Sequence, residues 1–301
     1  MQNARKRKLI SSKNNKQHSE ITITKIKSNK TKKNPKLDAI EPYPSHLRPT
    51  PEDCLAIRDE LLKFQGFPEE FAKYREEREN PEPNSSNLIN GSVKSEVSAE
   101  KLSVLDGLVS IVLSQNTADV NSQKAFASLK AAFPTWELVL AAEQNLLENA
   151  IRCGGLAPTK ASCIRNILSC LKERSGKLCL EFLRDLSIDE IKSELSSFKG
   201  IGPKTVACVL MFHLQLDDFP VDTHILQIAT TLGWVPEGAD AKKTYLHLNR
   251  RIPNELKFDL NCLLFTHGKM CNSCSTKTVK HEKKESVNKP CPLLNHCKKS
   301  D

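Results

Sequence analysis

Two sequence patterns are missing from this chain of 301 residues. No apolar run approaches the roughly 20 residues of a membrane-spanning helix, so we expect no membrane partner. No stretch alternates apolar and polar residues with a period of two, the pattern of a half-buried strand. Apolar residues instead recur at helical spacing. The sequence therefore predicts an all-α fold, and its 39% of hydrophobic residues suffice for one sizeable core or two small ones.

Acidic residues are almost absent from the first 36 positions, which hold twelve lysines and arginines and only one acidic residue, Glu20. Because apolar residues are also scarce, we expect residues 1–45 to form a disordered basic arm. Arg5-Lys6-Arg7-Lys8 resembles a nuclear import signal, so we expect a nuclear protein, with an organelle as the alternative. The remaining chain is slightly acidic, so DNA binding by the folded part would need a local basic patch.

Composition and periodicity divide the rest of the chain into three segments. Residues 46–101 combine N-terminal helices with a flexible polar insertion at 80–99. Residues 102–225 have the apolar spacing of successive helices that would form a compact bundle and end in a helix-hairpin-helix at 187–215. Residues 226–301 hold C-terminal helices and a four-cysteine tail. We expect this last segment to pack with the N-terminal helices as a second lobe.

The helix-hairpin-helix has signals at each of its parts. Ser187 and Glu190 have the spacing of a capping box, and apolar residues follow at helical spacing until two glycines end the helix. Pro203 then suits the first position of a second helix. Glycines allow another backbone to approach closely, and the N–H groups at a helix start can bind phosphate. The candidate DNA contacts in this motif are Gly200, Gly202 and Thr205.

Two residues near this turn could carry out chemistry. Lys204 falls in the first turn of the second helix, where the helix dipole and any burial both disfavour the ammonium form, as in a nucleophilic amine. Asp222 is the predicted N-cap of the next helix, and a short loop from Asp217 to Val221 could fold it back toward Lys204. A single lysine at a helix start is usually a solvated charge, and a single aspartate there is usually an N-cap. The hypothesis of a catalytic site therefore depends on Lys204 and Asp222 occurring together.

The spacing of this pair resembles that of a known family. Gly-Ile-Gly-Pro-Lys-Thr-Val-Ala at 200–207, followed by Pro-Val-Asp-Thr-His-Ile at 220–225, is similar to the endonuclease III branch of the HhH-GPD DNA glycosylases. The resemblance covers about residues 102–297. It implies a two-lobed helical fold with residues 102–225 as a helical barrel, a monomer, and double-stranded DNA bound between the lobes. It also implies that Lys204 attacks the sugar C1′ and that Asp222 is the essential carboxylate.

The same resemblance implies a bifunctional DNA glycosylase and AP lyase of base excision repair, which removes an oxidised pyrimidine through a lysine Schiff base. An alternative substrate is 5-methylcytosine, because Leu-Ser-Gln-Asn at 113–116 and Gly-Trp-Val-Pro at 233–236 are similar to plant glycosylases of the DEMETER type. An alternative of another class is a non-catalytic protein that uses the hairpin only to hold DNA.

Two more segments are similar to DNA contacts of the family. The family inserts a polar side chain into the gap left by a flipped base from the segment that matches residues 113–119, and Gln115 is the residue carried over. Gly-Gly-Leu-Ala-Pro-Thr-Lys-Ala at 154–161 matches a glycine turn before a helix that approaches the DNA backbone, with Lys160 as the candidate contact. The alternative for the first segment is a helix end with ordinary polar caps.

The chain has eleven cysteines and starts without the pattern of a secretory leader, so we expect a reducing compartment. Four cysteines near the end have the spacing C-x2-C-x16-C-x5-C, whereas the family binds a [4Fe–4S] cluster through C-x6-C-x2-C-x5-C. A lysine-rich insertion from Thr276 to Lys289 accounts for the difference. Four thiolates could hold a [4Fe–4S] cluster, zinc or no metal. The candidate ligands are Cys271, Cys274, Cys291 and Cys297.

Overall fold

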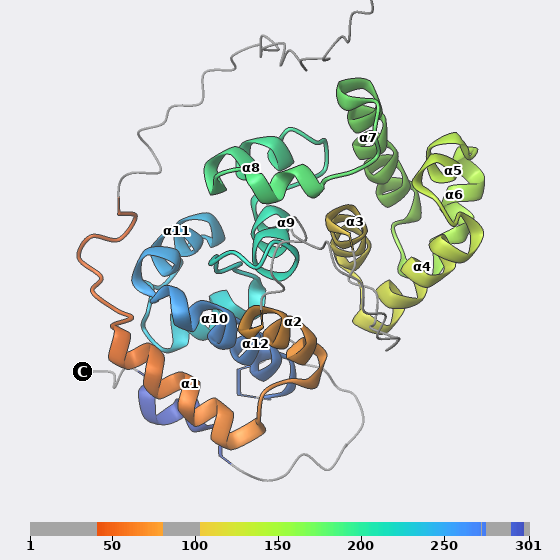
Figure 1. Cartoon of the computed structure of the whole chain (residues 1–301). Helices are drawn as coiled ribbons and strands as arrows, with labels where there is room; N and C mark the ends of the chain where they lie inside the picture. Colours follow the sequence, from red (N-terminus) through yellow and green to blue (C-terminus); the bar gives the residue numbers. More distant parts are fainter. Residues whose placement is uncertain (1–40, 81–102, 272, 275–289, 298–301) are drawn as a thin grey trace, which may run out of the picture. The chain divides into compact units, whose positions relative to one another are not determined.

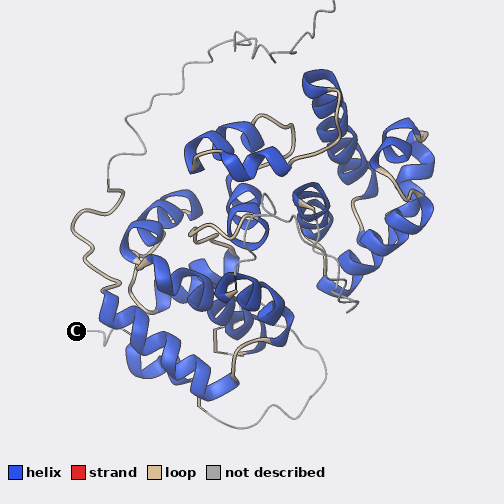
Figure 2. Ribbon diagram, in the orientation of Figure 1, coloured by secondary structure: helices blue, strands red, loops and turns tan. Residues whose placement is uncertain are grey.

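The computed structural model describes residues 41–80, 103–271, 273–274 and 290–297. Most of the predicted arm, the insertion after Asn80 and the lysine-rich stretch at 276–289 lie outside these residues. The described residues belong to one unit, Ile40–Asp301. They form helices and no strand, which confirms the all-α prediction (Figure 2). None of the described helices has both the length and the apolar character needed to span a membrane.

Figure 1 shows the arrangement of the described helices. In chain order they are α1 (Pro51–Gln65), α2 (Glu69–Glu79), α3 (Val104–Ser114), α4 (Asp119–Ala132), α5 (Trp136–Ala141), α6 (Gln144–Ala150), η1 (Arg152–Gly154), α7 (Ala157–Ser175), η2 (Glu181–Asp185), α8 (Ile188–Ser196), α9 (Pro203–Cys208), the π-helix η3 (Val209–His213), α10 (Thr223–Thr231), α11 (Ala241–Arg251), α12 (Asn254–Met270) and η4 (Pro292–His296). The break between α1 and α2 falls at Gly66-Phe67-Pro68, where a glycine and a proline interrupt the helical pattern.

The buried residues of the first hydrophobic core lie between Val104 and Leu214. Its centre is α3, which packs against α4, α7, α9 and η3. Because other helices surround α3, it is apolar on almost every side, with Leu105, Leu108 and Val112 fully buried. Each such leucine contributes about 1.5 to 3 kcal/mol through burial. This core is continuous in the sequence.

The second core joins both ends of the described chain. Helix α12 packs against α1 and α10, and η4 packs against α1. Ile57 and Leu61 of α1 meet Leu260 and Leu263 of α12, and the indole of Trp234 is fully buried in the same core. Residues more than 190 positions apart therefore share this core.

A buried loop carries the chain from the first core to the second, between η3 and α10. Within it, the carboxylate of Asp218 is only 2% exposed. It accepts a hydrogen bond from the Tyr245 hydroxyl at 2.9 Å and forms an ion pair with Lys192 Nζ at 3.1 Å. The Asn261 amide donates to the Pro220 carbonyl at 2.8 Å. A buried carboxylate is stable only with such partners, so this loop is fixed to α8, α11 and α12.

Helices α3 and η3 approach each other closely at a glycine. A Cβ atom at Gly107 would lie 2.4 Å from the His213 ring, which is much closer than two non-bonded atoms can approach. Burial lowers the pKa of His213 to about 4, so the imidazole is neutral at physiological pH. Glycine at position 107 therefore allows a neutral histidine to fill the space between the two helices.

We expect Gly107→Ala to destabilise the protein, although alanine is normally the better helix former by about 0.5 to 1 kcal/mol. Overpacking of this contact should instead cost about 1 to 3 kcal/mol, measured as a lower midpoint in urea unfolding. In the His213→Ala background the ring is gone, so the same alanine should cost little or stabilise α3. Equal costs in both backgrounds would show that the ring is not what Gly107 accommodates.

Candidate active site

The helix-hairpin-helix forms at the predicted residues. The Ser187 side chain accepts a hydrogen bond from the Glu190 amide, and Glu190 Oε2 accepts one from the Ser187 amide at 3.0 Å, which completes the capping box. Gly200 has φ +92°, and a Cβ there would lie 2.9 Å from Cys163 Sγ of α7. The Lys199 amide donates to the Asn166 side chain of α7 at 2.9 Å. The hairpin is thus held against α7, and position 200 requires glycine.

The structure brings the predicted pair, Lys204 and Asp222, to the same two cavities. Lys204 is the second residue of α9 and is exposed, so the burial that the sequence analysis considered does not occur. Among the described residues, none pairs with its amine. Asp222 is the N-cap of α10, where one carboxylate oxygen accepts a hydrogen bond from the Ile225 amide at 2.8 Å. The second oxygen is not needed for this cap.

The thiol of Cys208 lies one helical turn after Lys204 and lines the same cavity. Burial raises the pKa of this thiol to about 11; the charge of Lys204 acts to lower it, and the charge of Asp222 acts to raise it. Both charges are therefore within electrostatic reach of one buried sulfur. The effect of both charges on Cys208 agrees with the finding that Lys204 and Asp222 line the same cavity.

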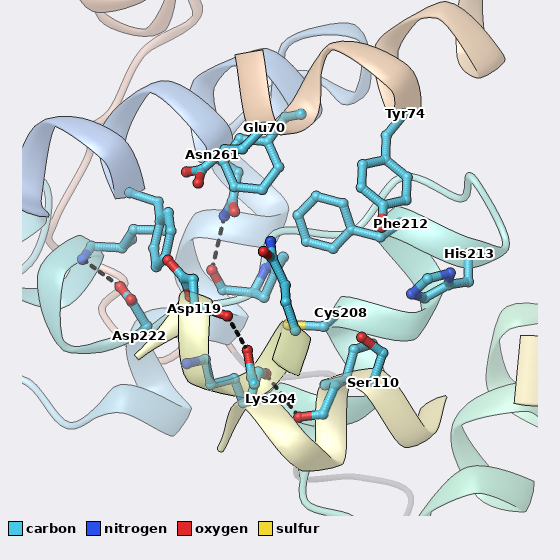
Figure 3. Close-up of a pocket in the computed structure, with 18 residues that line it drawn as sticks. Glu70, Tyr74, Ser110, Asp119, Lys204, Cys208, Phe212, His213, Asp222 and Asn261 are labelled. Atoms are coloured by element: carbon cyan, nitrogen blue, oxygen red, sulfur yellow. Dashed lines mark hydrogen bonds between the residues drawn. The ribbon is translucent and has the colours of Figure 1, made fainter. Parts of the chain in front are cut away.

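The smaller cavity has a volume of about 270 Å³, near the lower end of small-molecule pockets. Its aromatic wall comes from α2 and η3, where the Phe71 and Phe212 rings stack at 5.5 Å and Tyr74 meets Phe212 edge-on at 5.2 Å. In Figure 3, Asp222 lies at the left of this cavity and Tyr74 at the right. Polar groups of Glu70 and Asn261 also line it. A cavity with aromatic walls and a few polar groups suits a flat ring that carries polar groups at its edge.

The larger cavity, of about 590 Å³, shares Lys204 and Asp222 with the smaller one. Lys269 also lines it, pairs with Asp119 of α4 and places its ammonium 4.8 Å from the centre of the Phe265 ring. The cavity is therefore bordered by two lysines from separate helices and by two aspartates, Asp119 and Asp222. Lys269 is paired with Asp119, so Lys204 is the lysine left to meet a negatively charged group of a ligand outside the aromatic pocket.

The Gln115 side chain occupies a different position from the one expected. Its Nε2 donates to Thr205 Oγ1 at 3.0 Å, and Thr205 is only 6% exposed, so both predicted DNA contacts bind each other in this structure. The next residue, Asn116, is exposed, has φ +51° and lines the larger cavity. Asparagine tolerates this left-handed conformation better than most residues, which is the signal in the sequence that could have identified it.

Lys160 also differs from the expectation of a DNA contact. It is 2% exposed, and its ammonium donates to the Leu113 carbonyl at 2.6 Å, to the Gly154 carbonyl at 2.9 Å and to the Thr117 hydroxyl. Burial lowers its pKa. With its donors used inside the protein, Lys160 connects the end of α3 to the turn before α7 and is not available to a phosphate. The sequence could not show this, because the three acceptors converge only in the fold.

Three of the four candidate metal ligands come together, with a histidine in place of the fourth. Ligand atoms of His267, Cys271, Cys274 and Cys291 all lie within 4.8 Å of one another. Cys297 is not in this group, and its thiol donates to the Leu293 carbonyl at 3.3 Å. Each cysteine of a [4Fe–4S] cluster binds a different iron, so its sulfurs are farther apart than two ligands of one ion. The 3.6 Å between the sulfurs of Cys274 and Cys291 does not fit that cluster.

We expect Lys160→Met to lower stability without altering DNA affinity. The change leaves buried acceptors without donors, which should cost about 1 to 3 kcal/mol and lower the Tm. Lys172→Met on the exposed face of the same helix is the control and should do little. Fluorescence anisotropy with a DNA duplex, at a temperature where both variants are folded, measures affinity. A loss of affinity in Lys160→Met alone would restore the DNA-contact interpretation.

Comparison with known proteins gives one consistent family. Residues 109–254 match the HhH-GPD superfamily of base excision DNA repair proteins. The chain is 57% identical over 265 residues to a putative DNA glycosylase of Arabidopsis thaliana, covering 86% of this chain and 89% of that protein. It is 26% identical over 208 residues to endonuclease III of Sulfolobus acidocaldarius, covering 68% of this chain and 86% of that protein.

The fold agrees with this result. A trapped covalent intermediate of endonuclease III with DNA superimposes with a TM-score of 0.58 at 21% identity, over 83% of this chain and 96% of that chain. At this identity the match is evidence for the fold alone. Together with the hairpin and the position of Lys204 and Asp222, the sequence relationships establish that the chain belongs to the HhH-GPD superfamily of base excision DNA repair proteins.

Proposed function

We propose that this protein is a bifunctional DNA glycosylase and AP lyase that excises a modified base through a covalent bond to Lys204. The observation that carries the proposal is the position of Lys204 and Asp222 on the border between an aromatic pocket and a larger cavity. Family membership supports the DNA substrate. The endonuclease III structure trapped as a covalent intermediate supports a covalent step on this fold.

The chemistry begins with the flipped nucleotide. Lys204 Nζ, as the free amine, attacks C1′ of the sugar, and the base leaves with the electron pair of the glycosidic bond and takes up the proton that the attacking nitrogen then loses; solvent protonates O4′ when the ring opens. Positive charge develops on the sugar as this bond breaks, and the carboxylate of Asp222 stabilises it. The nitrogen then loses a proton and the sugar ring opens to a Schiff base between C1′ and Nζ. Removal of a C2′ proton expels the 3′ phosphate and nicks the strand.

The small cavity is the proposed binding site for the extruded base. The stacked rings of Phe71 and Phe212 offer an apolar surface, and Glu70 and Asn261 offer hydrogen-bond partners for the edge of a base. A volume of about 270 Å³ is large enough for one extruded base. The similarity to endonuclease III favours an oxidised pyrimidine as the substrate, and the similarity of residues 113–116 and 233–236 to DEMETER-type glycosylases makes 5-methylcytosine the second candidate.

We expect Lys204→Gln to abolish both borohydride trapping and strand nicking, while DNA binding persists, because glutamine has no nucleophilic amine. Asp222→Asn should slow base removal by about 100-fold or more, the scale of a lost electrostatic contact in a transition state. It should retain part of the nicking of a pre-formed abasic site, where the base is already absent. Gels with an oxidised-pyrimidine, a 5-methylcytosine and an abasic duplex, with and without borohydride, measure all three effects.

Lys199→Gln is the matched control for this experiment, since it removes a lysine from the hairpin without touching either cavity, and it should keep trapping. A covalent adduct in Lys204→Gln would mean that another amine is the nucleophile. A parent protein that forms no adduct on any of the three duplexes, yet binds them, would replace the proposal with a non-catalytic DNA-binding role.

We further infer that Asn116, and not Gln115, enters the gap that the flipped base leaves in the duplex. Asn116→Ala should slow base removal from a paired duplex about tenfold, which corresponds to about 1.4 kcal/mol in the barrier. Nicking of an abasic site should change less, because no base has to leave the stack. Gln115→Ala removes the bond to Thr205 and should mainly lower the Tm. Single-turnover rates decide between them, and a larger rate effect of Gln115→Ala would refute this assignment.

A further inference from the structure

The cysteine cluster at the end of α12 has the composition of a closed metal site. His267 is 1% exposed, Cys274 6% and Cys291 7%. Cys271, the fourth member, is partly exposed. Three cysteines and one histidine are one of the standard ligand sets of structural zinc.

The distances within the cluster match those between ligands of a single ion. Zinc–sulfur bonds of about 2.3 Å at tetrahedral angles place two sulfurs about 3.8 Å apart, and a zinc–nitrogen bond places sulfur and nitrogen about 3.6 Å apart. The sulfurs of Cys274 and Cys291 are 3.6 Å apart, and His267 Nε2 is 3.3 Å from Cys291 Sγ. One ion fits among these atoms, whereas a cluster with four irons does not.

The hydrogen bonds of Gln65 indicate which nitrogen of His267 has a free lone pair to bind a metal ion. The Gln65 amide donates through Nε2 to the Leu263 carbonyl at 3.1 Å, which turns Oε1 toward His267 Nδ1 at 3.2 Å. An amide oxygen only accepts, so Nδ1 carries a proton, and in the neutral ring Nε2 then presents its lone pair to the cysteines. Metal-bound histidines almost always donate their other N–H in this way.

Backbone geometry brings the remaining ligands to His267. The Cys271 amide donates to the His267 carbonyl at 2.8 Å as α12 ends, and the Cys274 amide donates to the Cys271 carbonyl at 3.2 Å in the following turn. Cys291 begins the segment that contains η4, which packs against α1. An ion here would join α12, the turn after it and the C-terminal segment at one point.

We propose that this chain binds one zinc ion through Cys271, Cys274, Cys291 and His267, with Gln65 as the positioning residue for the histidine and without participation of Cys297. The ion has a structural role: it attaches the segment from Cys291 onward to the second core. This site is separate from the proposed base excision chemistry and does not depend on it.

The test is the metal content and ligand shell of the full-length protein. We expect about one zinc per chain by elemental analysis, and a zinc-edge X-ray absorption spectrum that fits three sulfurs and one imidazole nitrogen. This measurement needs no variant, so it cannot fail through misfolding. Cobalt(II) added to the metal-free protein should give the visible bands of a tetrahedral thiolate site.

Variants separate the two sets of ligands. Cys297→Ser is the control for Cys291→Ser, because the two cysteines lie in the same short segment; only Cys291→Ser should lose the zinc. His267→Asn should weaken zinc binding at least 100-fold, and Gln65→Leu about 10- to 100-fold. Four irons with sulfide in anaerobically purified protein, a shell of four sulfurs, loss of metal in Cys297→Ser, or no binding of added zinc would each overturn the proposal.

Discussion

The relative position of Lys204 and Asp222 depends on a buried carboxylate, Asp218, that lines neither of the two cavities. In the loop that precedes Asp222, Asp218 is held by Lys192 of α8 and Tyr245 of α11. A buried charge without partners would cost several kcal/mol, so the loop has one stable conformation. Lys204 is in α9, which continues into η3 before this loop, and Asp222 is the N-cap of α10 after it. The separation of the amine and the carboxylate is therefore set partly by contacts made outside the two cavities.

Much of the fold could be predicted because its signals are local. The capping box at Ser187 and Glu190, the glycines of the hairpin and the Gly-Phe-Pro break between α1 and α2 each act within a few residues of chain. Helix α5 was missed because six residues carry too short a periodic pattern. The π-helix η3 was missed because its wider turn has no marked sequence signature, although it places Phe212 and His213 beside the pocket.

The site was only partly predictable, because several roles depend on direction and convergence. Whether Gln115 or Asn116 faces the cavity is decided by the backbone angles of one residue. Lys160 looks like a phosphate contact in the sequence and is buried only because acceptors from three segments meet around it. Likewise, Cys297 matches the family spacing, whereas His267 takes its place among the cysteines through a contact that no spacing reveals.

The division of the chain into one continuous core and one built from both ends has a consequence during synthesis. Helix α1 leaves the ribosome long before its partner, since Gln65 and the Leu263 carbonyl that it binds are 198 residues apart. At about 5 to 20 residues per second, α1 waits roughly 10 to 40 s, and the core around α3 can fold completely in that interval. A nascent chain that stops before α12 therefore carries a finished first core and an α1 whose apolar face has no cover, which makes early termination a source of chains that chaperones and proteases must remove.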